Sequence, residues 1–256
     1  MNIIHQILIN DSNNIPNKLP RYTEVCIKKM RDIYFDYDHK LYSGEEIENI
    51  LKNNFDKDVL DAYKKLNPYA FKADLARYCL LYLYGGIYSD LNNFFLNRID
   101  EDYDFFAFCD RNIASRRTWA VINSIMISKK KSKVLERCIN TIIDHCKNYY
   151  YGDNCIDVTG STVLGKSIVL EQKNIQNLST FGELNFISPN DMRVIRNDEI
   201  ELKDKIFDDV VEGFWCNHRN KVMSLYKPAT MVNLNLFGHK GTNCYRTMWK
   251  EKKVYN

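Results

Sequence analysis

Residues 69–93 read YAFKADLARYCLLYLYGGIYSDLNN, and this stretch decides the fold. Its first half has helical spacing, because apolar side chains recur at i, i+4, i+7 and i+8 and form a stripe suited to face a core: Leu75, Cys79, Tyr82 and Leu83. Residues three and four apart are neighbours on a helix, so a second face groups Asp74, Arg77, Tyr78 and Leu81. The sequence therefore predicts a helix with an acid–base pair on one face.

Two glycines, Gly85 and Gly86, are predicted to end this helix, since glycine readily adopts the left-handed conformation that a helix end often requires. A short buried strand is indicated directly after them by the apolar residues Ile87, Tyr88 and Leu91. The strand delivers two side chains with oxygen atoms, Asp90 and Asn92, to its far end. One tight turn thus joins the acid–base pair to two side chains of the type that bind metals.

Short apolar runs and amphipathic segments alternate along the rest of the chain. The runs predict strands at 2–10, 33–42, 105–109 and 121–127. Helical spacing predicts helices at 22–33, 44–54 and 134–146, the second of them opened by a capping box of Ser43 and Glu46. This alternation favours an α/β fold with a mainly parallel central sheet.

Composition narrows the class of protein. With 256 residues the chain is long enough to bury a large core, and we expect one domain over residues 1–256. A net charge of +3 is too mild to indicate a nucleic-acid partner. Eight scattered cysteines without a C-x-x-C pair fit reduced thiols in a cytosolic protein. No signal peptide and no apolar run near the ~20 residues of a membrane span is found, so we expect a cytoplasmic protein without such a span.

The pattern A-D-L-x-R-Y-x-x-L-Y-x-x-G-G-I-Y-x-D-x-N over residues 73–92 resembles the DXD-containing sugar-binding region of a family of retaining glycosyltransferases. That family includes yeast Golgi initiation mannosyltransferases, bacterial capsular-type transferases and the glucosyltransferase domains of large clostridial toxins. The opening NIIHQILIN, residues 2–10, resembles the first strand of the family, with Leu8 where a tryptophan is usual. The resemblance implies the GT-A type of α/β fold, a Rossmann-like single domain.

The resemblance also implies how a nucleotide-sugar donor is bound. Asp74 would bind hydroxyls of the donor sugar, and Arg77 would lie between the sugar and the diphosphate, where a guanidinium suits oxyanions. Tyr78 would pack beneath the site or contact the donor. The glycines Gly85 and Gly86 would let the backbone turn close to the donor, and Leu8 would lie near the base. A UDP-sugar is favoured over a GDP-sugar.

A divalent cation, Mn²⁺ or Mg²⁺, is implied because the diphosphate is a poor leaving group until its charge is neutralised. Asp90 would supply the carboxylate, and Asn92 would supply a neutral amide oxygen where the family has a second Asp. Two late histidines, His218 and His239, are candidates for a further metal or phosphate contact, and His239 is the one we include among the metal ligands. In this interpretation Asp74, Arg77 and Asp90 are the catalytic residues, and no covalent nucleophile is expected.

A glycan or protein acceptor is expected beside the donor. The segment Asp157-Val158-Thr159-Gly160-Ser161 resembles a Thr-Gly-Pro element of the family on the acceptor side, with Ser161 in place of the proline. Capping of a helix over 162–170 is the alternative explanation for Ser161. Asp110 and Asp157 are candidates for orienting the acceptor, and Asn123 stands where the family often has asparagine.

The hypothesis is therefore a metal-dependent retaining glycosyltransferase that moves a hexose from a nucleotide sugar to a glycan or protein. One alternative is a catalytically silent protein that keeps the donor pocket but, with Asn92, has lost turnover. Another is a structural module in which Asp74 and Arg77 form an ordinary surface ion pair. In that case Arg77→Ala would cost at most ~1 kcal/mol and change no response to a ligand.

Overall fold

The computed structural model describes residues 2–99, 103–110, 117–172, 178–179, 183–187, 211–216, 221–226, 234–239 and 243–256. Its helices are α1 (Arg21–Ile33), α2 (Gly44–Asn54), α3 (Lys57–Lys65), α4 (Tyr69–Tyr84), α6 (Lys133–Lys147), α7 (Ser161–Glu171) and α8 (Tyr245–Lys250), with 3-10 turns η1 (Cys155–Asp157) and η7 (Leu234–Phe237). Its strands are β1 (Ile3–Leu8), β2 (Asp38–Ser43), β3 (Gly86–Ser89), β4 (Asn93–Phe95), β5 (Phe105–Cys109), β6 (Val121–Ser128), β7 (Leu178–Ser179), β8 (Glu183–Ile187), β9 (Val211–Cys216) and β10 (Lys221–Tyr226).

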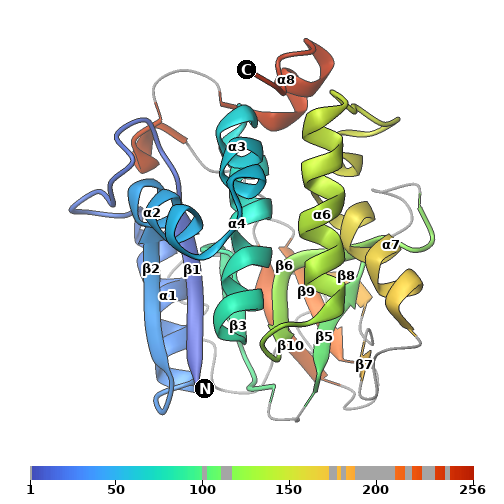
Figure 1. Ribbon diagram of the computed structural model, residues 1–256. Coiled ribbons are helices and arrows are strands. Elements are labelled where there is room, and N and C mark those ends of the chain that lie inside the picture. The colour runs from blue at the N-terminus through green and yellow to red at the C-terminus, as the bar shows by residue number, and fades with distance from the viewer. Residues whose placement is uncertain are drawn as a thin grey trace.

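These strands form one twisted sheet in the order β2-β1-β3-β6-β5-β8-β9-β10-β4, with β7 beside β5 (Figure 1). The strands β1, β2 and β3 are parallel, whereas β6 lies antiparallel to both β3 and β5. Of the described strands only β4, β6 and β9 run against the common direction. The predicted α/β fold with a mainly parallel sheet is confirmed.

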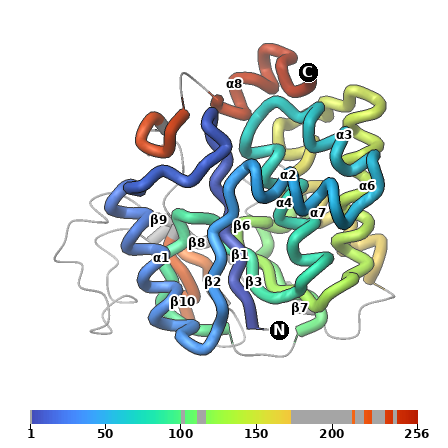
Figure 2. Tube along the Cα trace, turned by 60° about the vertical axis from the view of Figure 1, so that its left-hand side comes forward, coloured from blue at the N-terminus to red at the C-terminus, as the bar shows by residue number. Residues whose placement is uncertain are grey.

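Helices cover both faces of the sheet (Figures 1 and 2). Each face has its own apolar core. On one face α2, α3, α4, α6 and α7 pack on alternate residues of the strands, such as Ile7, Tyr88 and Phe105. On the other face α1 contributes Met30 and Tyr34, which pack on Ile4, Ile87 and Phe106 together with other apolar residues. Side chains alternate between the two faces of a strand, which is why neighbouring residues such as Ile87 and Tyr88 enter different cores.

Most predicted elements are found within a few residues of their expected bounds. The capping box of α2 is present, with the Ser43 hydroxyl accepting from the Glu46 amide and the Glu46 carboxylate accepting from the Ser43 amide. The strand expected at 33–42 begins only at Asp38, because α1 continues through Ile33 and a turn occupies residues 34–37. His5 of β1 is fully buried between the Tyr42 hydroxyl and the Gly85 carbonyl, so its role is structural.

The amphipathic character expected of α4 is wrong. Every residue from Asp74 to Leu81 is buried, whereas Tyr82 and Leu83 of the expected core stripe are only half-buried. The helix lies between β1, β3 and β6 on one side and α3 and α6 on the other, so it has no solvent face along its middle turns. Burial of the whole turn means that Asp74 and Arg77 are held inside the protein.

The C-terminal segment packs at the junction of α3 and α4. In Figure 1, α8 lies above α3 and α4, and Tyr245 of α8 packs on Phe71 with ring centroids 5.7 Å apart. The Trp249 indole donates a hydrogen bond to the Tyr151 carbonyl, and Tyr255 forms an isolated antiparallel β-bridge with Leu66. In the part of the chain that the structure describes, no helix is long and apolar enough to cross a membrane.

Candidate active site

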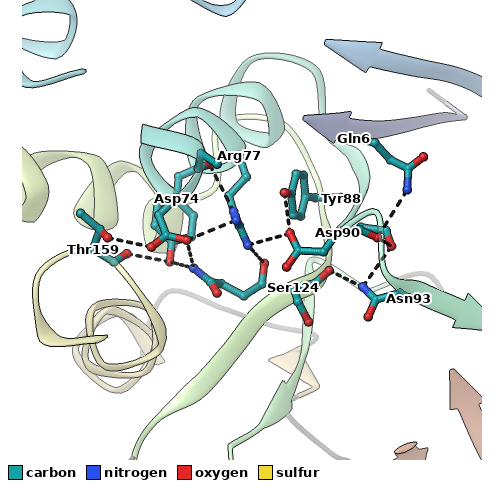
Figure 3. Close-up of polar contacts among 12 residues, drawn as sticks. Gln6, Asp74, Arg77, Tyr88, Asp90, Asn93, Ser124 and Thr159 are labelled. Atoms are coloured by element: carbon teal, nitrogen blue, oxygen red, sulfur yellow. Dashed lines mark hydrogen bonds and ion pairs between the residues drawn. The ribbon is translucent and has the colours of Figure 1, made fainter. Parts of the chain in front are cut away.

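A buried row of three charged side chains forms the centre of the site (Figure 3). The Arg77 guanidinium lies between two carboxylates, 3.3 Å from Asp74 Oδ1 and 3.2 Å from Asp90 Oδ1. The side chains of Asp74 and Arg77 are 13% and 7% exposed, whereas that of Asp90 is 28% exposed. The row therefore begins inside the protein and ends at a carboxylate that is open to a ligand.

Local sequence explains why these three residues meet. Asp74 and Arg77 are three residues apart on α4, which places them one above the other on the helix. Asp90 directly follows β3, and its neighbour Tyr88 donates a hydrogen bond of 2.7 Å to Asp90 Oδ1. The guanidinium also lies over the Tyr88 ring, 4.5 Å from its centroid. The predicted grouping of Asp74, Arg77 and Asp90 is what the structure contains.

Two residues from distant parts of the chain hold Asp74 in place. The Asn123 side-chain amide donates to Asp74 Oδ1 (2.8 Å) and to the Tyr78 hydroxyl (2.9 Å). The Thr159 hydroxyl donates to Asp74 Oδ2 (2.7 Å), and the Thr159 carbonyl accepts from Tyr78. Tyr78 is fully buried, so it packs beneath the site.

An irregularity of β6 directs Asn123 toward Asp74. Ala107 and Phe108 are consecutive in β5, yet they pair with Met126 and Ile122 of β6, so the residues between these two partners bulge from the ladder. Bulges are frequent beside active sites, where they re-aim side chains. The bulge supplies two groups to the site, because the Asn123 carbonyl also accepts a 2.9 Å hydrogen bond from Arg77.

Burial governs the electrostatics of this row. It raises the pKa of Asp74 above the ordinary value, against the opposing effects of Arg77 and of the hydrogen bonds from Thr159 and Asn123. Burial lowers the pKa of Arg77, but Asp90, Tyr88 and Asp74 together raise it by more than burial lowers it. The guanidinium therefore stays charged. A charge buried this deeply needs its partners, because the penalty for removing it from water is several kcal/mol.

The turn that carries Asp90 is held by a second set of polar side chains, which the sequence did not reveal. The Asp90 carbonyl accepts from the Ser89 hydroxyl (3.0 Å) and from the Gln6 amide (3.4 Å). The Asn93 side-chain amide donates to Ser89 Oγ (3.2 Å) and to the Ser124 carbonyl (2.9 Å), and that carbonyl also accepts from the Asp90 amide. Asn93 thus ties the end of β3 to β6. No local motif marks these contacts, which join β1, β3 and β6.

Oxygen atoms at and near the Asp90 turn are suited to a divalent cation. Among the described residues, Asp90 Oδ2 has no hydrogen-bond partner, and two polar atoms close to the Asp90 turn, Asn93 Oδ1 and Ser124 Oγ, are buried without one. No group of three or more His, Cys, Asp or Glu that could hold a metal is found in the described part of the chain. Such a site fits Mg²⁺ or Mn²⁺, which usually bind through one or two carboxylates plus substrate phosphates and water.

The remaining predicted donor and metal residues have different positions. Leu8 is buried at the end of β1, on the same side of that strand as Gln6. Asn92 is half-buried in the turn after Asp90, and its carbonyl accepts from Tyr22 of α1. His239 packs edge-on against Tyr69 (5.2 Å), and Asp11 lies near enough to raise its pKa, although burial has the larger, lowering effect. His218 lies outside the described residues.

The two glycines are not brought to this row. Gly85 has φ +62° and ends α4, as predicted, while Gly86 has φ +96° and begins β3. A side chain on Gly86 would come within 2.4 Å of the Ile3 carbonyl of β1, which explains the need for glycine. Both residues lie at the opposite end of β3 from Asp90. The positive φ angles and the close approach of β1 explain why glycine stands at these positions.

On the expected acceptor side, Gly160 lies directly against the row. A Cβ atom added to Gly160 would lie 3.6 Å from Asp74 Oδ2. Gly160, rather than Ser161, is the N-cap of α7. Asp157 is buried and accepts from the amides of Asp153 and Asn154 and from Arg117. Asp110 follows β5, and its amide donates to the Ala120 carbonyl.

Comparisons with known proteins agree with this geometry. Residues 16–108 match the family model described as "Glycosyltransferase sugar-binding region containing DXD motif". "Uncharacterized glycosyltransferase L373" of Acanthamoeba polyphaga mimivirus is 43% identical over 91 residues, which cover 36% of this chain and 35% of that protein. "Mannosyl phosphorylinositol ceramide synthase CSH1" of Saccharomyces cerevisiae is 27% identical over 197 residues, 76% of this chain and 49% of that protein. The chain therefore spans half or less of the length of these relatives.

A solved structure, "PaToxG Glycosyltransferase", superposes with a TM-score of 0.52 at 15% identity, over 68% of this chain and 70% of that one. This likeness concerns the fold, and it confirms the predicted GT-A type. Both the sequence of residues 16–108 and the fold are therefore similar to those of glycosyltransferases. The match covers residues 16–108, less than half of the chain, and the predicted resemblance to the DXD-motif glycosyltransferases is confirmed.

Proposed function

We propose that this chain transfers a hexose from a nucleotide-sugar donor to an acceptor, with retention at the anomeric carbon and with a divalent cation. The observation that carries the proposal is the row Asp74–Arg77–Asp90, which ends at a partly exposed carboxylate directly after β3. Ligands of open α/β sheets bind outside the carboxyl ends of the strands, where Asp90 lies.

Each residue has a distinct role in this proposal. Asp90 Oδ2 and the Asn92 side chain would hold the cation, which would supply charge neutralisation at the leaving diphosphate. Arg77 fixes Asp90 by pairing with its other oxygen and adds positive charge beside the phosphates. Asp74, oriented by Asn123 and Thr159, accepts hydrogen bonds from the donor sugar. The single domain over residues 1–256 is part of the same proposal.

Two lines of evidence bear on the identity of the donor sugar. The resemblance favours a UDP-sugar, while one relative is named for a mannosyl product, so a GDP-linked mannose donor belongs in the same test. The experiment is release of free nucleotide from a panel of UDP- and GDP-sugars with Mn²⁺, Mg²⁺ or EDTA. We expect slow hydrolysis of one donor that depends on the metal and is lost in Asp90→Asn, a variant that keeps the shape of the side chain.

A second candidate is favoured by Asn92, which adds no negative charge to the site. It is a silent protein that binds the nucleotide sugar without turnover. Calorimetric binding of a donor that the enzyme never hydrolyses, with or without sugar acceptors, would identify this alternative. Neither binding nor hydrolysis of any donor in the panel would contradict both candidates.

A further inference from the structure

An exposed tryptophan lies beside the site on a firmly held backbone. Trp119 is 46% exposed, whereas the next residues, Ala120 and Val121, are buried. The Trp119 carbonyl packs so closely on α7 that a Cβ at Gly165 would come within 1.7 Å of it. The backbone is therefore seated where only glycine fits beneath it, and the indole remains open to solvent.

Two routes along the chain connect Trp119 to the candidate active site. Three residues separate it from Asn123, which binds Asp74, so even a fully extended chain leaves the two Cα atoms at most about 14 Å apart. The second route passes through Arg117, which pairs with Asp157, two residues before Thr159. Because β6 is antiparallel to β3, its first residues lie at the edge of the sheet where Asp90 lies.

Polar groups flank the indole. The Arg117 guanidinium is 5.8 Å from the Trp119 ring centroid and binds Asp153 (2.9 Å) and Asp157 (3.3 Å). The Asp153 side chain is 89% exposed and available to a ligand. Tyr150, 42% exposed, stacks on His145 at 4.1 Å and lies close enough to Asp157, Asp153 and Arg117 to feel their charges.

This combination matches the two-sided character of a sugar ring. A pyranose presents C–H bonds with partial positive charge on one face, which suit the negative face of an aromatic ring, and a rim of hydroxyls that need polar partners. Resting on the proposed function, we propose that Trp119 is the acceptor platform of this site and stacks on a pyranose ring of a carbohydrate acceptor. Asp153 and Arg117 bind hydroxyls at the rim of that ring.

Two other exposed aromatic residues in the described part of the chain, Tyr149 and Phe35, lack this combination, and one of them provides a control. The Tyr149 ring is covered by Lys65, 3.5 Å from its centroid, and packs against Tyr255. Phe35 is 83% exposed and lies just before β2, at the opposite edge of the sheet from the end of β3. Phe35→Ala therefore removes an even more exposed aromatic ring far from the site.

The test uses the full chain and the donor that the nucleotide-release panel identifies. Methyl α-mannoside, methyl α-glucoside and a Ser/Thr peptide are each offered as acceptors, and donor hydrolysis without acceptor is measured in parallel. We expect transfer to a methyl glycoside, with KM for the glycoside raised about tenfold in Trp119→Ala and largely restored in Trp119→Phe. Hydrolysis without acceptor should be unchanged in Trp119→Ala, and Phe35→Ala should behave as wild type.

The outcomes separate this inference from the proposed function. An unchanged KM in Trp119→Ala, or transfer to the peptide but not to either glycoside, would overturn the platform while leaving the donor chemistry intact. If wild type hydrolyses no donor, the proposed function fails, and saturation-transfer NMR with the same methyl glycosides decides the platform. Signals that persist in Trp119→Ala, or that are absent from wild type, would then refute it.

Discussion

Replacement of Arg77 by alanine is expected to destabilise the protein by about 3–5 kcal/mol at pH 7, the range for removing one partner of a buried ion pair. The guanidinium has two carboxylate partners and also donates to the carbonyls of Asn123 (2.9 Å) and Ala73 (3.2 Å). Of the two carboxylates Asp74 loses most, because it is the more buried and would keep only Asn123 and Thr159 as partners. A surface pair would instead cost at most ~1 kcal/mol.

The loss should also depend on pH in a defined direction. Burial already raises the pKa of Asp74, and removing Arg77 removes the opposing effect, so that pKa rises further in the variant. A folded-state pKa above the unfolded one means that the folded state binds more protons, which favours folding as the pH falls through that window. The deficit of Arg77→Ala relative to wild type should therefore be smaller at pH 5 than at pH 8.

Urea unfolding followed by circular dichroism measures both effects. In a thermal unfolding experiment, the melting temperature of Arg77→Ala should fall by roughly 6–20 °C, because 1 kcal/mol corresponds to about 2–4 °C in a protein of this size. Lys147→Ala, which breaks the exposed pair with Asp58, is the control and should change stability by less than ~1 kcal/mol. Asp74→Asn introduced into Arg77→Met should recover part of the loss, since no buried charge then lacks a partner. A deficit under 1 kcal/mol for Arg77→Ala would refute the argument.

Two further predictions follow from the same contacts. In the nucleotide-release assay, Asn93→Ala should lower donor turnover about 10- to 100-fold, the usual effect of replacing a residue that orients a metal ligand. Asn97→Ala is the control and should leave turnover unchanged, because it loses a comparable 2.7 Å hydrogen bond, to the Val222 carbonyl, away from Asp90. Burial lowers the pKa of His5 to about 4, so the unfolded state takes up a proton at a higher pH than the folded state. Stability should therefore fall as the pH drops from about 6.5 toward 4, with this residue contributing a loss of about 2 kcal/mol at pH 5. Urea unfolding at pH 7 and pH 5 should show a smaller change in His5→Gln than in wild type, and an equal change would contradict the assignment.

The part of the site that could be predicted from the sequence is the part encoded locally. Asp74 and Arg77 share a helix face and Asp90 follows the next strand, so spacing alone brings them together. The acid–base pair was open to interpretation as a surface pair because periodicity does not reveal what packs on the second face of α4. Contacts with β3 and β6, with α3 and α6 and with Thr159 make that face internal.

The residues that could not be predicted act across long sequence distances. Asn93 and Gln6 are ordinary polar residues in the sequence, and their role depends on β1, β3 and β6 being neighbours in the sheet. Thr159 lies in a segment singled out by resemblance, but its bond to Asp74 spans 85 residues. The glycines show the converse, since the resemblance implied a backbone turn close to the donor at Gly85 and Gly86, whereas β3 separates both of them from Asp90.

The meaning of Asn92 follows from counting charge along the buried row. Asp74 and Asp90 carry two negative charges and Arg77 one positive charge, so the row bears one net negative charge, and Arg77 already occupies one oxygen of Asp90. A neutral amide at Asn92 leaves the protein with little charge to bind a divalent cation by itself, while a diphosphate supplies both charge and oxygen ligands. In the proposed function, metal and donor would then strengthen each other's binding by thermodynamic linkage. Weak affinity for the metal alone is therefore compatible with an active enzyme, and only nucleotide release that depends on Asp90 separates that enzyme from a silent binder.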